Sequence, residues 1–506
     1  MTSNKDEKVI HSNKTELPKS LIPLESMPTE SYLCTWDLQA DVAGKLGIAG
    51  ETCSELRDAL TAQTLFGEEN YYHCVEREFR RGLYFMLDDG WDVPFGTKNI
   101  VGNGREFFGS IDPDPEKFAE FGDTPEKRLK GLSEKIKEYG YAGLGLWIAP
   151  QQINETEKCN SETARKYWEE RAIWCHKAGI SYWKVDWGDH QRDVEYRRMM
   201  TETVRKFAPG LIIEHAIPQQ PYDTINGEEF VEYRRKTTEQ LLPISDVFRL
   251  YDVYKPFREV ALLARADEVF SCDVKREYDV LGLVNAEIEP YVAAALGCTV
   301  GIMKHSTEMR ALLNWQKISP PFGIFECGYK KSDDRLYDKL YFENNILWMQ
   351  TAGKEIVESA PAIMARGCDL PKVTACGEVV PFVAASKNPR TGAYALASFR
   401  RNVDPNRNVW GLADVELRID EKELTIGIFG IFNAVHLVFD DDIEQNITVM
   451  AQDLAGCGDA VDITKQIVIK GNTLTLDGRL LRSFGKQNRG NGDESIPATV
   501  LEVINL

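Results

Sequence analysis

Short apolar runs that end in acidic residues recur along this chain, separated by stretches whose apolar residues have helical spacing. The clearest runs cover residues 83–89, 181–186 and 247–252. Each run has the length of one strand, and each intervening stretch is long enough for a helix. Strands joined by helical crossovers pair in parallel, and their carboxyl ends meet on one face of the sheet. The acids at these ends are therefore expected to lie close together.

The segment 124–186 shows this alternation most clearly. Thr124 is a good N-cap, Pro125 suits the first helical position, and Gly140 predicts the end of that helix. A buried strand over 142–148 and a second helix then lead directly into the next acid-ending strand. The segment is a predicted βαβ crossover.

The same reasoning extends over most of the chain. We expect strands at 32–36, 83–89, 142–148, 181–186, 211–215, 247–252, either 269–272 or 280–284, and 299–303, with further helices near 191–207 and 229–241. About eight such strands favour a closed (β/α)8 TIM barrel over an open sheet. Beyond about residue 360, short alternating segments such as 379–384, 393–399 and 466–470 are separated by Gly, Asn, Pro and Asp. That pattern predicts a C-terminal antiparallel β-sandwich.

The length supports more than one domain. At 506 residues the chain exceeds the roughly 250–300 residues at which a single core stops growing. We expect a flexible N-terminal tail over 1–28, a catalytic barrel over 29–357 and a β-sandwich over 358–506. The tail is charged and contains proline, with too little apolar content to pack.

Charge restricts the class of partner. The formal net charge of −19 argues against nucleic acid and against an anionic membrane, since either would require a basic patch. A neutral small molecule or oligosaccharide fits better. No run approaches the roughly 20 apolar residues that cross a bilayer, and the N-terminus lacks a signal-like apolar region. We expect a cytoplasmic protein, and an oligomer is possible.

The eleven cysteines do not form a metal or redox motif. The closest pair, Cys368 and Cys376, is eight positions apart, so no CxxC unit exists. We interpret the cysteines as reduced thiols, mostly buried.

The acids at the strand ends suggest glycosidic bond cleavage. Retaining cleavage requires a nucleophilic carboxylate and a carboxylic acid about 5–5.5 Å apart. Asp186 is the predicted nucleophile, because Lys184 shares its strand face and keeps the carboxylate ionised. Asp252, which follows Arg249, is the predicted general acid/base. A strand-terminal Asp can instead cap the next helix, but three acid-bearing strand ends together with Glu214 weaken that alternative.

The sequence Asp88-Asp89-Gly90-Trp91 fits sugar recognition. Carboxylates bind paired hydroxyls bidentately, and an indole covers the apolar face of a sugar ring. A metal site is the rival interpretation, but no His lies nearby and no further acid has ligand spacing. We therefore expect no metal and no organic cofactor. Further indoles that line the pocket or belong to the core are Trp36, Trp147 and Trp187.

These residues resemble the motifs of the clan D glycoside hydrolases, the α-galactosidase or melibiase group of families 27 and 36. The resemblance spans roughly residues 30–500 and implies a TIM barrel followed by an antiparallel sandwich. It assigns sugar binding to the second-strand motif that begins at Asp88, and nucleophilic attack to Asp186 in Lys-x-Asp. It also implies that a fifth-strand Glu, here Glu214 with His215 competing for the place, contacts the sugar, and that Arg249 precedes the acid/base Asp252.

The chain departs from the family pattern at three points. The spacing from Arg249 to Asp252 is one residue shorter than in family 27. The seventh-strand Asp-Pro-Asp motif is absent, with Asn285-Ala286-Glu287 in its place. The disulfide-forming cysteines of secreted relatives have no counterpart. The chain thus resembles a distant branch of the group.

The sequence as a whole predicts a retaining, exo-acting α-glycosidase that works through a covalent glycosyl-Asp186 intermediate. An α-galactosidase is the first expectation, with a terminal galactose-like sugar as substrate. A β-L-arabinopyranosidase, an α-N-acetylgalactosaminidase and a transglycosidase remain alternatives, because they would share the same residues. A catalytically inactive carbohydrate-binding protein is the alternative of another class, distinguished by the lack of a second carboxylate facing Asp186.

Overall fold

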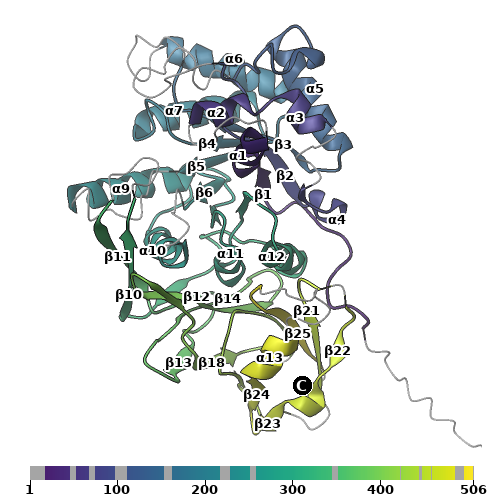
Figure 1. The fold of residues 1–506 in the computed structure, drawn as a ribbon, viewed down its shortest axis with the longest axis vertical. Coiled ribbons are helices and arrows are strands. Elements are labelled where there is room, and N and C mark those ends of the chain that lie inside the picture. Colours follow the sequence, from purple (N-terminus) through teal and green to yellow (C-terminus); the bar gives the residue numbers. More distant parts are fainter. Residues whose placement is uncertain are drawn as a thin grey trace, which may run out of the picture.

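The structure is a computed structural model. It describes residues 18–45, 53–67, 74–96, 111–152, 162–216, 228–250, 258–344, 352–421, 423–443, 447–456, 458–484 and 495–504. Figure 1 shows two parts of the molecule, one of strands and helices drawn in purple to teal and one rich in strands drawn in green to yellow.

The N-terminal part is a parallel barrel. Its sheet has eight strands in the order β7-β6-β5-β4-β3-β2-β1-β8, and all its pairings are parallel. A parallel bridge between Asn285, the last residue of β7, and Thr299, two residues before β8, connects the two ends of the sheet. The strands are β1 Ser31–Cys34, β2 Leu83–Leu87, β3 Gly143–Ile148, β4 Tyr182–Val185, β5 Ile212–Ala216, β6 Val247–Arg249, β7 Leu283–Asn285 and β8 Gly301–Ile302. The predicted (β/α)8 TIM barrel is confirmed.

The seventh strand was the one with two candidate positions. The structure places it at β7, which overlaps the 280–284 alternative, whereas residues 269–270 end a helix. The 269–272 alternative was therefore wrong. Apolar residues such as Val269 are buried in both kinds of element, so a short apolar run does not by itself distinguish a strand from a helix end.

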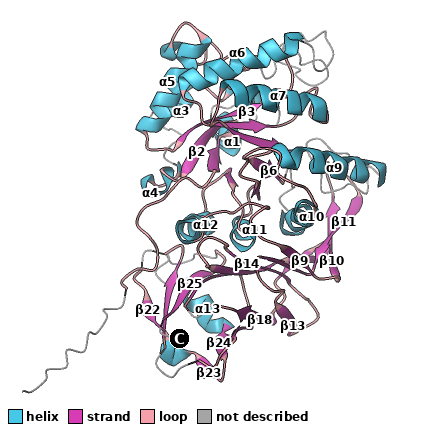
Figure 2. Ribbon diagram, turned by 180° about the vertical axis from the view of Figure 1, so that it is seen from behind, coloured by secondary structure: helices cyan, strands magenta, loops and turns pink. Residues whose placement is uncertain are grey.

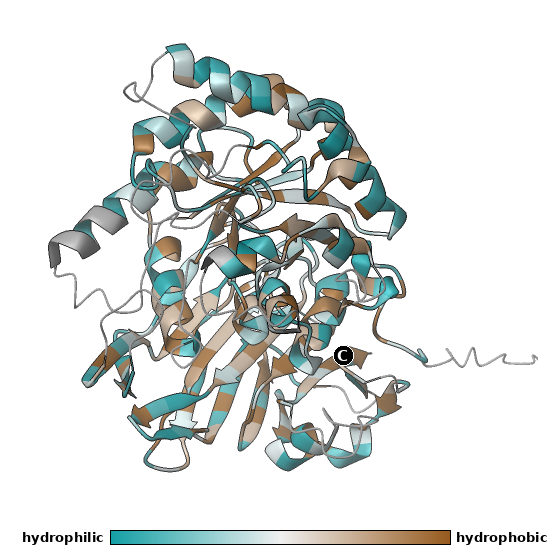
Figure 3. Ribbon diagram, turned by 45° about the horizontal axis from the view of Figure 1, so that its top comes forward, coloured by the Kyte–Doolittle hydropathy of each residue, from teal (hydrophilic) through white to brown (hydrophobic). Residues whose placement is uncertain are grey.

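Helices surround the barrel, as the views in Figures 1 and 2 show. They are α1 Trp36–Lys45, α2 Cys53–Asp58, α3 Ala62–Phe66, α4 Arg77–Arg80, α5 Pro125–Glu138, α6 Glu162–Ala178, α7 Val194–Phe207, α9 Glu228–Leu241, α10 Arg258–Phe270, α11 Pro290–Leu296 and α12 Thr307–Ile318. Thr124 caps α5 by accepting from the Lys127 N–H, as its sequence predicts. Figure 3 shows both hydrophilic and hydrophobic residues along these outer helices, as expected for amphipathic helices packed on a barrel.

Alternate side chains of each barrel strand face different layers. The inward-facing apolar side chains form a cluster of their own, consisting of Tyr32, Cys34, Met86, Tyr182, Val247 and Leu283. Their neighbours in sequence, such as Leu33, Trp183 and Phe248, belong to the larger core between barrel and helices. This two-residue period decides which polar residues at the strand ends enter the barrel.

The C-terminal part is a two-sheet sandwich. One sheet has the order β22-β21-β25-β19-β15-β14-β12-β9 and the other β13-β18-β20-β24-β23. A shared apolar cluster with side chains from both sheets fills the space between them, for example Leu396 with Leu437. Most strand pairs are antiparallel, as predicted, but β12 pairs with β14, β15 with β19 and β18 with β20 in parallel.

The strands of this part, with its helix, are seen in Figure 2 from behind. They are β9 Tyr329–Lys331, β10 Arg335–Phe342, β11 Lys354–Pro361, β12 Ile363–Arg366, β13 Lys372–Ala375, β14 Phe382–Lys387, β15 Tyr394–Phe399, β16 Arg401–Asp404, β17 Arg407–Val409, β18 Ala413–Ile419, β19 Leu424–Phe429, β20 Ala434–Phe439, β21 Thr448–Asp453, β22 Val461–Asp462, β23 Val468–Lys470, β24 Thr473–Asp477, β25 Ala498–Ile504 and the helix α13 Gly478–Phe484.

Barrel and sandwich share one continuous core. The large apolar cluster that surrounds the barrel strands also includes Phe382 and Phe429 of the sandwich. Polar contacts cross the same boundary, since Asp267 of α10 accepts from Lys331 Nζ of β9 at 2.6 Å and pairs with Arg335 of β10 at 3.1 Å. The strand β9 precedes the predicted boundary at 357 but lies in the sheet of the sandwich. The domain limits predicted from the sequence stay predictions.

The N-terminal segment that is described runs along the surface of both parts. Leu21 donates its backbone N–H to Gln452 Oε1 at 2.7 Å, and Ser26 donates to the Glu78 carbonyl at 3.1 Å. Residues 1–17 of the predicted tail lie outside the described residues. Among the described helices, none combines the length and apolar content needed to span a bilayer.

Candidate active site

Polar residues whose side chains face the inside of the barrel lie together at the carboxyl ends of its strands. Asp88 follows β2, Lys184 lies in β4 and Asp186 directly follows it, while Arg249 ends β6 and Glu287 follows β7. All five residues are at most 7% exposed. This end of a parallel barrel is where the connecting loops form active sites, so the structure brings most of the predicted residues together there.

Two hydrogen-bond donors and an ion pair hold Asp186. Trp147 Nε1 donates to Oδ2 at 2.7 Å, and the backbone N–H of Trp187 donates to Oδ1 at 2.9 Å. Arg249 Nη2 lies 3.2 Å from Oδ1. Donors on both oxygens fix the carboxylate in one orientation. The predicted nucleophile is thus an oriented carboxylate.

Arg249 connects three carboxylates. Besides Asp186, it contacts Glu214 Oε1 through Nε at 3.1 Å and Glu287 Oε1 through Nη1 at 2.7 Å. Burial disfavours the charge, but the neighbouring carboxylates outweigh it and raise the pKa of Arg249 well above its ordinary value. The guanidinium is therefore a permanent cation at the centre of the site.

Glu214 lies deeper in the barrel. It is fully buried and its register partners are Lys184 and Val247, two positions before the strand end of β6. Oε1 accepts from Tyr32 at 3.1 Å, and Oε2 accepts from Tyr182 at 2.8 Å and from Asn285 Nδ2 at 2.9 Å. Burial raises the pKa of Glu214 while Arg249 opposes this shift.

Asp88 pairs with Lys184. The Lys184 ammonium is 2.6 Å from Asp88 Oδ2, and the Cys34 thiol donates to the same oxygen at 2.9 Å. Burial lowers the pKa of Lys184, but Asp88, Cys34 and Asp186 together raise it above its ordinary value. Burial, then Asp88, raises the pKa of the Cys34 thiol. The site therefore holds a charged pair together with a neutral thiol.

Asp89 faces the helix layer. Arg57 of α2 binds both its oxygens, with Nε 2.8 Å from Oδ1 and Nη2 on Oδ2. Asp89 is 3% exposed and Arg57 is 2% exposed. Burial raises the pKa of Asp89 and the guanidinium opposes this shift. Adjacent acids at the end of β2 thus have separate partners, because successive side chains of a strand point to opposite faces.

The predicted indoles differ in their surroundings. Trp91 is fully buried, and its Nε1 donates to the Trp147 carbonyl at 3.0 Å. Trp147 is nearly as buried, and its ring lies edge-on to Trp187 with centroids 6.4 Å apart. Trp36 is half-buried and packs against the cluster inside the barrel. Of these four indoles, Trp36 and Trp187 retain exposed surface.

His215 and Asp252 complete the predicted set. His215 faces α7, where Arg197 Nη1 donates to Nδ1 at 3.1 Å and Thr201 Oγ1 lies 2.8 Å from Nε2. Burial, with Arg197 adding to it, lowers the pKa of His215 well below 6.5, so the imidazole is neutral and lies outside the barrel. Asp252, the predicted acid/base, lies outside the described residues.

Sequence reasoning did not assign Arg57, Tyr32, Tyr182 or Glu287 to the site. Arg57 comes from a helix with no motif, and nothing in the sequence identifies it as the partner of Asp89. The side chains of Tyr32 and Tyr182 face the inside of the barrel. Residues an even number of positions apart on a strand face the same side, so the positions of Cys34 and Asp186 would have pointed to Tyr32 and Tyr182. Glu287 stands in the place of the missing seventh-strand motif, and that position is the signal that could have found it.

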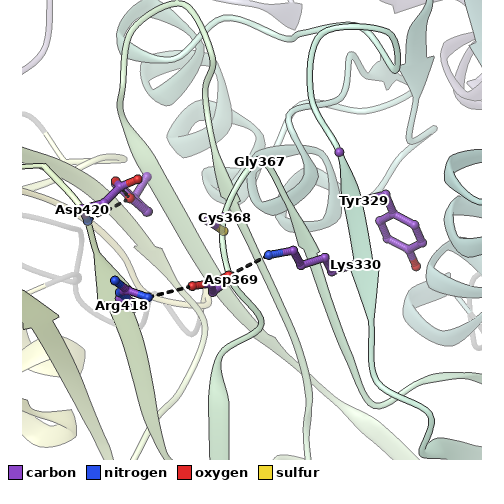
Figure 4. Close-up of a pocket in the computed structure, with 9 residues that line it drawn as sticks. Tyr329, Lys330, Gly367, Cys368, Asp369, Arg418 and Asp420 are labelled. Atoms are coloured by element: carbon purple, nitrogen blue, oxygen red, sulfur yellow. Dashed lines mark hydrogen bonds and ion pairs between the residues drawn. The ribbon is translucent and has the colours of Figure 1, made fainter. Parts of the chain in front are cut away.

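A cavity of about 420 Å³ lies elsewhere, in the sandwich. Figure 4 shows Lys330, Asp369, Arg418 and Asp420 around it, with Asp369 between the two cations. Asp369 lies 2.7 Å from Lys330 Nζ and 3.6 Å from an Arg418 nitrogen. None of the predicted catalytic residues lines this cavity.

Comparison with known proteins gives likenesses of fold alone. No protein-family model matches the sequence, and no curated protein matches it. Among solved structures, a family GH27 β-L-arabinopyranosidase from Geobacillus stearothermophilus is 8% identical with a TM-score of 0.38, over 95% of this chain and 96% of that chain. A putative α-N-acetylgalactosaminidase from Bacillus halodurans is 10% identical with a TM-score of 0.43, over 96% and 99% of the two chains.

A putative α-galactosidase/melibiase from Bacteroides fragilis is 9% identical, with a TM-score of 0.34 over 95% of this chain and 78% of that chain. These structures are glycoside hydrolases of the group whose motifs the sequence resembles. At these identities and TM-scores the likenesses bear on neither the substrate nor the mechanism of this chain.

Proposed function

We propose that the protein is a retaining, exo-acting α-glycosidase, with a terminal α-galactoside as its first candidate substrate. The observation that carries the proposal is the Asp186 carboxylate, which Trp147, Trp187 and Arg249 orient at the carboxyl end of a closed barrel. An oriented, ionised carboxylate at this place suits attack on an anomeric carbon.

The reaction has two displacements. An Asp186 oxygen bonds to the anomeric carbon while the bond to the leaving oxygen breaks, and a general acid gives that oxygen its proton. Water then attacks the anomeric carbon, the same residue removes a proton from the water, and Asp186 leaves as a carboxylate. Trp147 Nε1 and Arg249 stabilise that departing charge from their observed positions, 2.7 and 3.2 Å away.

Asp252 is the proposed general acid/base. It follows Arg249 by three positions in the sequence, and Arg249 contacts the nucleophile. The support for this role comes from the sequence, since Asp252 lies outside the described residues.

Sugar hydroxyls are proposed to bind Asp88 and Lys184, while Trp36 covers an apolar face of the ring. Trp147, which is 1% exposed, is proposed to act through its hydrogen bond to Asp186. Asp89 and Trp91, which the sequence placed in the same group, are proposed to hold the turn after β2. Their observed partners are Arg57 and the Trp147 carbonyl.

The first test is a panel of nitrophenyl glycosides, covering α-galactoside, α-N-acetylgalactosaminide, α-glucoside and β-L-arabinopyranoside. We expect the wild type to turn over the α-galactoside. In Asp186→Ala, kcat should fall by several orders of magnitude while the circular dichroism spectrum stays unchanged. Glu134→Ala, which removes an exposed acid from the outer face of α5, is the matched control and should keep full activity.

The second test is covalent trapping. A 2-deoxy-2-fluoro glycosyl fluoride of the preferred sugar should label the peptide that contains Asp186, and mass spectrometry should find no label in Asp186→Ala. Sugar binding by calorimetry without turnover of any glycoside would instead support the carbohydrate-binding alternative and overturn the enzyme.

The acid/base is tested separately. Asp252→Ala should still glycosylate on nitrophenyl substrates, whose leaving groups need little protonation. Azide should then accelerate this variant and give a glycosyl azide of retained configuration. Failure of azide to do so would assign the role to another carboxyl group.

A further inference from the structure

Glu287 occupies an unusual position at the end of β7. Its backbone φ is +53°, a left-handed conformation that few residues other than Gly, Asn and Asp adopt. Two hydrogen bonds hold this backbone, from its N–H to Asn285 Oδ1 at 2.8 Å and from the Gly301 N–H to its carbonyl at 3.0 Å. Strain that the surrounding structure maintains in this way is frequent at functional sites.

The side chain of Glu287 shares a guanidinium with the nucleophile. Arg249 Nη1 is 2.7 Å from Glu287 Oε1, and Nη2 of the same group is 3.2 Å from Asp186 Oδ1. The two carboxylates therefore lie on neighbouring nitrogens of one planar guanidinium. An anomeric carbon in contact with Asp186 therefore places its directly neighbouring oxygens within reach of Glu287.

Glu214 is less suited to meet the sugar. Its two oxygens already accept from Tyr32, Tyr182 and Asn285, and it is fully buried below the level of Arg249. Glu287 comes after the last residue of its strand, on the side of the barrel where a sugar enters.

We propose that Glu287 binds the hydroxyl on the carbon next to the anomeric carbon, the 2-hydroxyl of the glycone. This assignment rests on the proposed glycosidase function. A carboxylate paired with Arg249 accepts a hydrogen bond from that hydroxyl, and Arg249 transmits its position to Asp186. The substrate class is then a glycoside with a free 2-hydroxyl, since a 2-acetamido group would have to occupy the space beside Glu287.

The experiment compares two substrates on two proteins. The substrates are the nitrophenyl glycoside that the wild type prefers and its 2-deoxy counterpart, and the variant is Glu287→Gln. We expect kcat/KM to fall about tenfold or more on the parent glycoside, because a charge-assisted hydrogen bond is lost, and less than about threefold on the 2-deoxy glycoside. An equal loss on both substrates would overturn the assignment.

Glu289→Gln is the matched control. Glu289 is a buried acid two positions later whose Oε2 lies 2.7 Å from Arg258 Nε, so its loss should leave the ratio between the two substrates unchanged. If Glu287→Gln fails to fold, Glu287→Gly keeps the test possible, because Gly accepts the positive φ without strain.

Two further outcomes distinguish the role of Glu287 from the glycosidase function. Azide acceleration of Glu287→Ala would make Glu287 the acid/base and overturn its role as hydroxyl ligand. If the wild type turns over no glycoside, the proposed function itself is overturned. If the wild type is active but Glu287→Gln loses equal kcat/KM on the parent and 2-deoxy glycosides, only the role of Glu287 is overturned.

Discussion

Two adjacent acids after β2 pair with different cations, because their side chains point to opposite faces of the strand. Asp88 pairs with Lys184 inside the barrel, and Asp89 pairs with Arg57 in the helix layer. Both acids are almost fully buried, so each ion pair is isolated from water. Only the first pair belongs to the proposed sugar site.

Asp88→Asn and Asp89→Asn are expected to differ in activity. Both should lower the free energy of unfolding, by about 3–5 kcal/mol if the remaining cation stays unpaired. Below the unfolding transition, Asp88→Asn should lose about tenfold to a hundredfold in kcat/KM, because a charged ligand of the sugar is lost. Asp89→Asn should lose less than about threefold.

The measurement is kcat/KM per folded molecule on the preferred nitrophenyl glycoside, with folding followed by denaturant titration. A loss in Asp89→Asn as large as in Asp88→Asn, at equal folded fraction, would mean that both acids reach the sugar. Asp88 and Asp89 would then both bind sugar hydroxyls, as predicted from the sequence.

At the scale of elements, small residues on some strands make room for large ones on their neighbours. Gly301 of β8 pairs with Tyr32 of β1, and a Cβ at Gly301 would lie 2.9–3.0 Å from three atoms of the Tyr32 side chain. Gly145 of β3 is similarly close to Met86. Such large and small partners fill the interior of a small barrel.

Gly301→Ala is expected to disturb both stability and catalysis. The added methyl should cost about 1–3 kcal/mol in the free energy of unfolding through overpacking. It should also lower kcat, because a displaced Tyr32 no longer donates to Glu214, which positions Arg249. Denaturant titration and steady-state kinetics measure the two effects.

Gly44→Ala is the control for this prediction. A Cβ at Gly44 in α1 would meet nothing within 4 Å, so the change should be neutral or stabilising by up to about 1 kcal/mol through helix propensity. Unchanged stability and kcat in Gly301→Ala would show that the barrel interior has room that the packing does not indicate.

On the scale of the whole molecule, the barrel and the sandwich are packed as one body. Phe429 of β19 is fully buried, and its ring centroid lies 5.9 Å from Trp315 of α12 and 5.2 Å from Tyr291 of α11. Arg366 of β12 adds donors to the carbonyls of Phe322 and Gly323 at 3.2 and 2.9 Å. Helices of the barrel thus rest directly on the sheet of the sandwich.

Phe429→Ala is therefore expected to destabilise both parts together. The free energy of unfolding should fall by about 3–5 kcal/mol, and loss of activity and loss of far-ultraviolet dichroism should coincide along a urea titration. Val468→Ala, at a residue 64% exposed on β23, should change little. Activity lost well before the dichroism signal would indicate that the two parts unfold independently.

The sequence alone determined the barrel and much of its site. Apolar runs and helix caps are local signals, and parallel strands with crossovers permit few arrangements, so Asp88, Lys184, Asp186 and Arg249 could be placed at one end of the barrel. The same signals did not decide between two positions for the seventh strand, since both runs are apolar.

Only the tertiary structure decided the partners of each charge. Arg57 pairs with Asp89 and Arg249 joins Asp186 to Glu287 because elements far apart in sequence come together, which no local pattern records. The left-handed backbone of Glu287 likewise depends on contacts with Asn285 and Gly301. Local propensity specifies elements, whereas a buried charge takes its partner from whatever the packing brings within reach, because a charge left unpaired in the interior is too costly.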